Sequence, residues 1–282
     1  MIGKRYEMRP GAFVFRPAEV VRTHRVTPRL ARITIGGEAI SDMRSLAPDD
    51  DIRVQIPDRF DDTPLPPIVE FQPFQLIYPE NAPPSTIRAL TIRALRPAHQ
   101  ELDIEIALHN ESFLSRWAEQ ARPGQQVTVG GPRGSTIWAG SIDQYYLIGD
   151  ATALPAIGHF TGSLAEDVTA SIVAEVADAA EEQAFTHPAG ATVHATWLHH
   201  AGHPSRDISA LEAALSELPE PTESTAIFAA GESARMRLLR RWIVTRWPHV
   251  ARTQLRIAGY WKREDDDQEF FYEEDENSVE DA

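Results

Sequence analysis

Short runs of apolar and polar residues at strand-like spacing dominate the first half of the chain. Residues 1–15 carry no clear period and are predicted as an irregular arm or an edge strand. The runs at 30–35, 51–56, 87–95 and 101–108 are rich in β-branched residues or alternate between apolar and polar. Alternation of this kind is the period of a half-buried strand. Several short strands separated by turn residues predict a small antiparallel barrel.

The segments between these runs predict one helix and one long connection. Residues 57–86 are rich in proline, which predicts a surface connection rather than a helix. Residues 112–121 have apolar positions at helical spacing, and a Pro-Gly pair at 123–124 ends them. A further strand is predicted at 127–129, followed by a glycine-rich exit at 130–135.

After about residue 142, apolar strands alternate with helices. The predicted strands cover residues 145–148, 171–176, 192–198, 225–229 and 254–261. The predicted helices cover residues 153–164, 208–218 and 233–247. This alternation is typical of a parallel sheet with helices on its faces. The predicted fold class is therefore α+β followed by α/β, an antiparallel β-barrel domain at 1–140 and a parallel-sheet domain at 141–263.

Composition narrows the class of protein. A chain of 282 residues fits two domains of ordinary size. Cysteine is absent, which excludes disulfides, thiolate nucleophiles and cysteine-ligated metal centres. No run approaches the ~18 apolar residues of a membrane span, and the N-terminus lacks the apolar core of a secretory signal. We therefore expect a cytoplasmic protein without membrane insertion.

The net charge of −15 is concentrated at one end of the chain. Residues 264–282 hold eleven acidic residues and no basic one, which leaves 31 acidic against 27 basic residues elsewhere. Nucleic acid is not an expected partner, because the sequence shows no concentrated basic surface. The segment 264–282 is predicted to be an acidic disordered tail.

The first candidate site lies in the strand 87–95. Strand alternation places Arg88, Leu90 and Ile92 on one face. Thr91 and Arg93 then point to the other face. Two guanidinium groups near a hydroxyl can hold a diphosphate, because each makes paired hydrogen bonds to it. An ordinary surface strand is the alternative, which spacing alone favours.

The second candidate lies where a strand ending at His109 leads into the helix beginning near Ser112. Free N–H groups and the helix dipole attract phosphate at such a place. In the alternative, Ser112 only caps the helix and Trp117 fills the core. His109 either donates to a bound cofactor or satisfies a backbone carbonyl.

Two strand-to-helix junctions in the second half form a third candidate. Residues 149–155 and 229–232 each follow a predicted strand and open a helix. Open α/β sheets bind ligands at this carboxyl edge. Neither junction has the G-x-G-x-x-G pattern, so spacing alone is a weak sign of a dinucleotide site.

Other motifs add little. The histidines at 199, 200 and 203 have no carboxylate at ligand spacing and lie in a predicted loop, so no metal site is predicted. The absence of a G-x-S-x-G elbow and of a P-loop disfavours hydrolases and NTPases.

Taken in order over residues 16–262, these passages resemble the siderophore-interacting protein family, a branch of the ferredoxin-reductase-like flavoproteins. The resemblance is carried by residues 26–34, 51–54, 88–93, 108–109, 115–118, 131–135, 147–157, 175–176, 181–183, 231–232 and 259–262. It implies a ferredoxin-NADP reductase-like fold with an FAD-binding barrel and an NAD(P)H-binding domain. The implied activity is reduction of a ferric siderophore to release ferrous iron. No catalytic acid or base is implied, since the cofactor carries the chemistry.

The resemblance also implies site residues. The expected cofactor-binding residues are Arg88, Leu90, Thr91, Ile92, Arg93, His109, Ser115, Trp117, Asp150, Ala151, Thr152, Ala153, Gly231, Glu232 and Trp261. The expected substrate-binding residues are Arg53, Arg133 and Lys262, whose charges would concentrate an anionic ferric siderophore. Four arginines after Glu232 either meet the 2′-phosphate of NADPH or form the exposed face of a helix: Arg235, Arg237, Arg240 and Arg241. The expected donor is NADPH or NADH, with a lean to NADPH, and the expected state is a monomer.

Three positions depart from the family pattern. The family usually has tyrosine at position 90, glutamate at 151 and Gly-Pro-Ala before Ser115, where this chain has Leu90, Ala151 and Ser112 to Leu114. These departures leave a second function open, a siderophore-binding or flavin-binding protein of the same fold without nicotinamide-dependent turnover. A flavin reductase for another acceptor is a third possibility.

Overall fold

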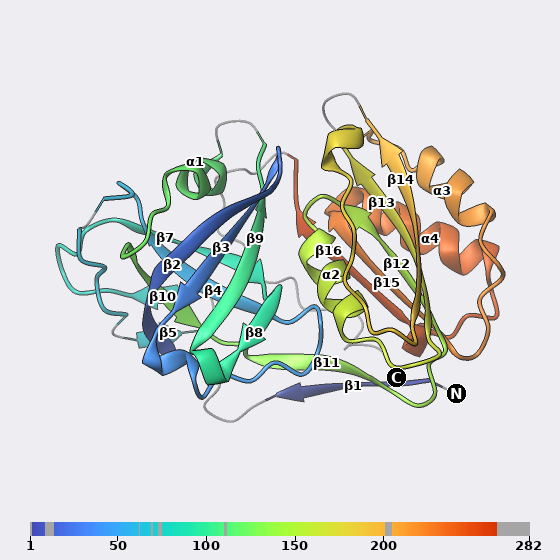
Figure 1. The fold of residues 1–282 in the computed structure, drawn as a ribbon, viewed down its shortest axis with the longest axis horizontal. Coiled ribbons are helices and arrows are strands. Elements are labelled where there is room, and N and C mark those ends of the chain that lie inside the picture. Colours follow the sequence, from blue (N-terminus) through green and yellow to red (C-terminus); the bar gives the residue numbers. More distant parts are fainter. Residues whose placement is uncertain are drawn as a thin grey trace.

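The computed structural model describes residues 2–8, 14–61, 63–68, 70–72, 75–109, 112–200 and 205–263. Two units lie side by side, an antiparallel sheet curled around its own core and a parallel sheet covered by helices (Figure 1). This is the fold class that the sequence predicts. The predicted acidic tail at 264–282 lies outside the described residues.

The first unit, the barrel domain, contains a seven-stranded sheet in the order β7-β4-β10-β2-β3-β9-β8 with every neighbouring pair antiparallel. Its strands are β2 (Phe15–Thr27), β3 (Leu30–Gly36), β4 (Asp51–Pro57), β7 (Ser85–Thr91), β8 (Ala94–Arg96), β9 (Glu101–Ala107) and β10 (Gln126–Gly130). The helix α1 (Phe113–Gln120) packs against β3 and β9. Two short 3₁₀ helices, Glu38–Ile40 and Pro97–His99, lie between strands.

The second unit, the parallel domain, has a five-stranded sheet in the order β14-β13-β12-β15-β16. Its strands are β12 (Gln144–Asp150), β13 (Thr169–Val176), β14 (Thr192–His199), β15 (Thr225–Glu232) and β16 (Leu255–Trp261). Its helices are α2 (Leu154–Gly162), α3 (Ser209–Ser216) and α4 (Ser233–Arg246), with 3₁₀ turns at Ala179–Glu181 and Arg252–Gln254. Apolar residues of α2 form one core with one face of the sheet, and those of α3 and α4 form another with the opposite face. Five strand ends therefore meet at one carboxyl edge.

Three strands lie where none was predicted, and the segment 1–15 contains the edge strand that was one of its two predicted alternatives. The proline-rich connection holds a short hairpin of β5 (Glu70–Gln72) and β6 (Gln75–Ile77). The glycine-rich exit leads into β11 (Gly134–Ala139), which pairs with β1 (Gly3–Met8) in a separate antiparallel ribbon below both units (Figure 1). Within the described residues, no helix combines the length and apolarity that a membrane crossing requires.

The two domains share a packed interface. Leu30 belongs to the barrel sheet, yet it is buried in the core that α2 forms with the parallel sheet. The carboxylate of Glu181 accepts hydrogen bonds from the hydroxyl of Thr27 (2.5 Å) and the backbone N–H of Arg29 (3.1 Å). Arg256 of the parallel domain pairs with buried Asp49 of the barrel domain at 2.7 Å. Apolar packing and buried polar contacts therefore fix how the domains sit against each other.

Candidate functional site

Arg88 on β7 places a positive charge beside the start of α1. Its guanidinium carbon lies 5.4 Å from the ring centroid of Phe113, the first residue of α1. Leu90 and Ile92, two and four residues on, are buried in the barrel core. A half-buried guanidinium thus contacts the side chain of the first residue of α1, and both a guanidinium and the N–H groups of a helix start attract anions.

The start of α1 is locally hydrogen-bonded. Ser112 caps the helix, because its hydroxyl accepts from the backbone N–H of Ser115 at 3.2 Å. The Ser115 hydroxyl accepts from the N–H of His109 (3.0 Å) and donates to the carbonyl of His109 (3.1 Å). The predicted cap is therefore confirmed. Ser115 links the end of the strand segment to the helix, which fixes the backbone at His109.

Trp117 lies behind this site. Its side chain is fully buried in the barrel core, and its indole N–H donates to the side-chain oxygen of Gln125 at 3.2 Å. This is the core position that the sequence left open as the alternative to a cofactor contact.

Asp150 organises the carboxyl edge of the parallel sheet. One carboxylate oxygen accepts from the backbone N–H (2.9 Å) and hydroxyl (2.6 Å) of Thr152. The other accepts from the indole N–H of Trp261 at 2.8 Å. A Cβ atom on Gly231 would lie 2.7 Å from this second oxygen, and Gly231 has φ of 158°, so glycine suits the position. Asp150 thus ties the end of β12 to the end of β16.

Trp261 brings the two edges together. Its ring faces the imidazole of His109 with centroids 6.5 Å apart and planes inclined by 28°. The predicted barrel site and the predicted carboxyl-edge site therefore meet at this ring pair. Flat aromatic faces from both domains suit a planar ring system.

Arg235 and Glu175 form a buried ion pair under the carboxyl edge. Two nitrogens of the guanidinium meet the two carboxylate oxygens at 2.6 and 2.8 Å, and the side chains are only 2% and 7% exposed. Burial alone would lower the pKa of Arg235, but hydrogen bonds and the charge of Glu175 raise it above its ordinary value. The expectation that Arg235 meets a 2′-phosphate or lies on an exposed helix face is wrong, because it is already paired inside the domain.

Glu232 caps α4, because its carboxylate accepts from the backbone N–H of Arg235 at 2.9 Å. Sequence reasoning named Glu232 but missed the role of Glu175. A charged residue within the apolar strand 172–176 was the available signal. Of the remaining arginines after Glu232, Arg237 and Arg241 are exposed, and Arg240 donates to the carbonyl of Ile257 at 2.9 Å.

Arg93 contacts both domains. Its guanidinium lies against Gly158 of α2, at the junction of the two domains, and its Nε lies 3.6 Å from Glu105. Ala153 is buried in the core of the parallel domain, and Ala151 packs against that core.

The three predicted substrate residues come from two regions. Arg53 on β4 pairs with Asp51 and is 16% exposed at its side chain. Strand register places Arg53 opposite Gly130, and Arg133 follows three residues later as an exposed side chain. Lys262 is half-buried and directly follows Trp261 at the end of β16.

Of the three histidines noted in the sequence, His199 and His200 lie within the described residues. His199 lies 2.9 Å from a carboxylate oxygen of Glu182, and no group of three potential ligands gathers anywhere in the described part of the chain. His203 lies outside the described residues.

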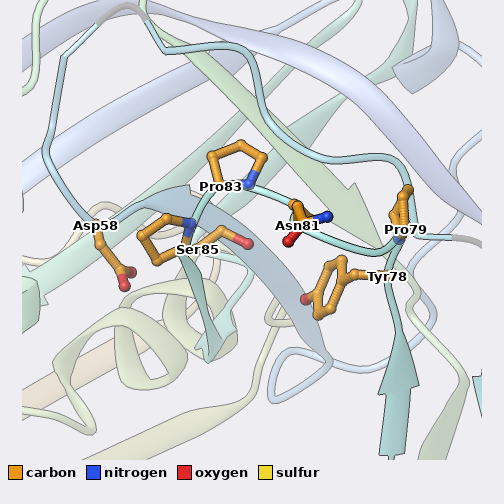
Figure 2. Close-up of a pocket in the computed structure, with 8 residues that line it drawn as sticks. Asp58, Tyr78, Pro79, Asn81, Pro83 and Ser85 are labelled. Atoms are coloured by element: carbon orange, nitrogen blue, oxygen red, sulfur yellow. The ribbon is translucent and has the colours of Figure 1, made fainter.

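Two cavities of about 380 Å³ each hold none of the predicted site residues. One is an open pocket of the proline-rich connection, where Tyr78, Asn81 and Asp58 surround the opening (Figure 2). The other lies between the domains near the amino ends of the parallel strands, lined by Trp138, Tyr145 and Phe160. The candidate site is thus defined by converging side chains at the carboxyl edge.

These residues suit a flavin dinucleotide. Arg88 and the start of α1 provide cationic and N–H donors for a diphosphate, and the His109–Trp261 pair provides flat faces for a ring. The carboxyl edge of the parallel sheet is joined to this ring pair, because Asp150 accepts a hydrogen bond from Trp261. Thr152 and Gly231 lie beside Asp150.

Comparison with known proteins agrees with this geometry. The family model of the siderophore-interacting FAD-binding domain matches residues 19–136, and the siderophore-interacting protein model matches residues 142–264. The ferric vibriobactin reductase ViuB of Vibrio cholerae is 28% identical over 248 residues, which cover 87% of this chain and 88% of ViuB. The NADPH-dependent ferric-chelate reductase of Escherichia coli is 29% identical over 251 residues, 88% of this chain and 92% of that protein.

A crystal structure of a siderophore utilization protein from T. fusca superposes with a TM-score of 0.78 at 31% identity. The match covers 93% of this chain and 97% of that one. The fold, the converging edges and these matches lead to one conclusion: the chain belongs to the siderophore-interacting protein family.

Proposed function

We propose that this protein is an FAD-dependent reductase that uses NAD(P)H to reduce ferric siderophores and so release ferrous iron. The observation that supports it most directly is the contact of Trp261 with both His109 and Asp150. This contact brings the diphosphate-attracting edge of the barrel domain to the carboxyl edge of the parallel domain. The names of the two curated relatives, a ferric vibriobactin reductase and an NADPH-dependent ferric-chelate reductase, support the same activity.

The barrel domain is the flavin side of this proposal. Arg88 and the first N–H groups of α1 hold the diphosphate. Thr91 offers a hydroxyl at the end of β7, and the backbone at His109 is fixed by Ser115. Leu90, Ile92 and Trp117 support these groups from the core. Bound FAD supplies the acceptance of a hydride and the release of single electrons.

The parallel domain is the nicotinamide side. Asp150 holds Thr152 and Trp261 in place, and Gly231 leaves room beside Asp150. Glu232 fixes the start of α4. Ala151 lies half-buried in the turn between β12 and α2, where its small side chain lets a ligand approach the backbone, and buried Ala153 supports this turn from the core. The relative from Escherichia coli favours NADPH as the donor.

The purified protein is expected to be yellow, with the absorption bands of oxidised flavin. Anaerobic addition of NADPH or NADH should bleach these bands, and a ferric siderophore should then restore them while a ferrous chelator reports released iron. Visible spectroscopy checks each step. A colourless protein that takes up no added FAD would contradict the proposal.

A second candidate function is supported by Leu90. At this position the family usually has tyrosine, whereas here an aliphatic side chain packs into the barrel core and offers no aromatic face. The candidate is a protein that binds flavin or a ferric siderophore without nicotinamide-dependent turnover. Flavin that stays yellow with excess NADPH and NADH, yet is bleached by dithionite, would favour this candidate over the reductase.

Arg53, Arg133 and Lys262 are the proposed contacts for an anionic ferric siderophore. Each change to alanine should raise KM for an anionic ferric chelate roughly two- to fivefold, which is the usual worth of one partly exposed charge. The effect should shrink at high salt, because ions screen exposed charges. Steady-state kinetics at two salt concentrations measures both.

Arg252→Ala is the matched control for these variants. Arg252 is exposed, as Arg133 is, but it precedes β16 and therefore lies at the opposite end of that strand from Lys262. Its removal should leave KM unchanged. If the alanine variants of Arg53, Arg133 and Lys262 all kept the wild-type KM, these residues would have no role in substrate recognition.

The remaining expectations belong to the same proposal. We place the domain boundary near residue 140, where β11 ends and the parallel domain begins. We expect the reductase to act as a cytoplasmic monomer, since a reductant of the NAD(P)H class is held inside cells. Size-exclusion chromatography with light scattering measures the mass in solution.

A further inference from the structure

We propose that Arg93 and Gly158 form a joint that sets the position of the parallel domain against the barrel domain. This inference rests on the proposed function. Within that function, Arg93 is a positioning residue for hydride transfer and not a phosphate ligand. Four observations carry this proposal: the fit of Arg93 on Gly158, the charges around it, a second contact on the same helix, and the rest of the interface.

The guanidinium of Arg93 lies flat on the backbone of α2. A Cβ atom built on Gly158 would lie 2.7 Å from Nε, 2.8 Å from Cζ and 2.9 Å from Nη2 of Arg93. Three atoms of the planar group are thus close to one point on the helix. No larger residue fits at position 158 unless Arg93 or the helix moves. Glycine in a helix interior is otherwise unfavourable, so its presence here has a steric reason.

On the barrel side, Arg93 shares one buried carboxylate with Arg32. The Glu105 carboxylate on β9 is 1% exposed and lies 3.6 Å from Nε of Arg93. The same oxygen accepts from Nε of Arg32 at 2.8 Å, while the second Glu105 oxygen is buried without a hydrogen-bond partner among the described residues. Burial lowers the pKa of Arg93, and Glu105 opposes this. The guanidinium of Arg93 is therefore attracted to Glu105 of the barrel domain, while its flat surface packs on Gly158 of α2.

The next residue of α2 makes a second contact with the same stretch of the barrel. The Nδ1 atom of His159 lies 2.9 Å from the carbonyl oxygen of Ile92. A carbonyl only accepts, so Nδ1 carries the proton. Neighbouring residues 92 and 93 therefore both touch neighbouring residues 158 and 159, which makes this a defined point of contact between the domains.

The other contacts between the domains limit how far the domains can shift to relieve a clash at Gly158. Glu181 is held by Thr27 and Arg29, and Leu30 is buried in the core of the parallel domain. A displacement at Gly158 therefore alters how the two candidate edges face each other. Hydride transfer needs the reacting atoms about 3–3.5 Å apart, and a misplacement of about 1 Å can cost about 100-fold in rate.

Gly158→Ala tests the joint, and Gly162→Ala is its matched control. Gly162 ends the same helix, and a Cβ atom there would meet only the carbonyl oxygen of Thr186, at 3.9 Å. In stopped-flow experiments, Gly158→Ala should slow reduction of the flavin by NADPH by about tenfold or more. Reoxidation of dithionite-reduced protein by a ferric siderophore should change by less than about twofold, because two of the three proposed siderophore contacts, Arg53 and Arg133, belong to the barrel domain. Gly162→Ala should match the wild type in both half-reactions.

A double variant separates steric contact from a general loss of stability. In an Arg93→Ala background the atoms that would clash are gone, so adding Gly158→Ala should change the reduction rate less than about twofold. Equal slowing by Gly158→Ala with and without Arg93 would overturn the proposal. So would wild-type behaviour of Gly158→Ala in every assay.

Hydrogen exchange of the FAD-free protein tests the joint without the reaction. Gly158→Ala should speed exchange in peptides covering 88–95 and 154–162 relative to Gly162→Ala, with the rest of both domains unchanged. If exchange responds in this way but NADPH bleaches no variant and no wild-type protein, the joint stands and the proposed function fails. If NADPH bleaches all variants at the wild-type rate and exchange does not respond, the joint fails and the function stands.

Discussion

Replacing Glu175 with alanine is expected to lower the free energy of unfolding by about 3–5 kcal/mol. The substitution leaves the guanidinium of Arg235 buried without its carboxylate, and an uncompensated buried charge is the main cost. Arg235 keeps only one other side-chain hydrogen bond in the described structure, from Nε to the carbonyl of Asp207 at 3.1 Å. Urea denaturation of the FAD-free protein measures the loss.

Glu220→Ala is the control for this prediction. Glu220 also pairs with an arginine, Arg246, at 3.3 Å, but the two side chains are 67% and 44% exposed. Exposed pairs contribute about 0–1 kcal/mol, so this variant should unfold close to the wild type. Equal stability of the Glu175 and Glu220 variants would mean that the pair under the carboxyl edge is not a buried charge pair in solution.

Trp117→Ala is expected to lower the free energy of unfolding of the FAD-free protein by about 3–5 kcal/mol. The reason is the cavity that the substitution leaves in the barrel core, together with the loss of the partner of Gln125. Trp117→Phe keeps most of the volume and removes only the indole N–H, so it should cost clearly less. Thermal and urea unfolding without FAD measure both.

The same pair of variants separates the two interpretations of Trp117. A core residue lowers stability whether or not FAD is present, and FAD affinity changes only through stability. An unchanged FAD-free stability with a large loss of FAD affinity would instead assign Trp117 to the cofactor site.

The elements that carry a strong period were predictable from the sequence. The apolar strands and helices of the parallel domain appear within a few residues of their expected bounds, for example α4 at Ser233–Arg246 against the predicted 233–247. The ribbon of β1 and β11 was not predictable, because its two strands are far apart in the chain and neither has a clear alternation.

Charged residues explain most of the remaining differences. On β9 the apolar residues Leu102, Ile104 and Ile106 are buried as expected, but Asp103 and Glu105 between them are buried too. Arginines cover these carboxylates, as in the bidentate contact of Arg96 with Asp103 at 2.6 and 2.7 Å. Alternation along one strand assigns such carboxylates to solvent, because the covering arginines, Arg96 on β8 and Arg32 on β3, stand on the neighbouring strands.

The candidate site was predictable in part. The order of motifs located both edges, and Asp150 and Trp261 were named. That they bond to each other could not be foreseen, since residues 150 and 261 meet only through the strand order of the parallel sheet. Helical spacing did contain a signal for Arg235, because it lies four residues before the buried Leu239. The position of the Arg93 side chain depends on its contact with Gly158, and no local sequence pattern predicts that contact.

The ribbon of β1 and β11 has a consequence for how the chain is made. Gly3 pairs with Ala139 and Met8 with Gly134, so β1 waits during synthesis for a partner that follows the seven strands of the barrel sheet. Lys4 also bonds the carbonyl of Leu255 at 3.0 Å, a residue of the last strand of the parallel domain. β1 is therefore synthesised before the barrel strands, yet it finds its partners only after β11 and β16 have been made.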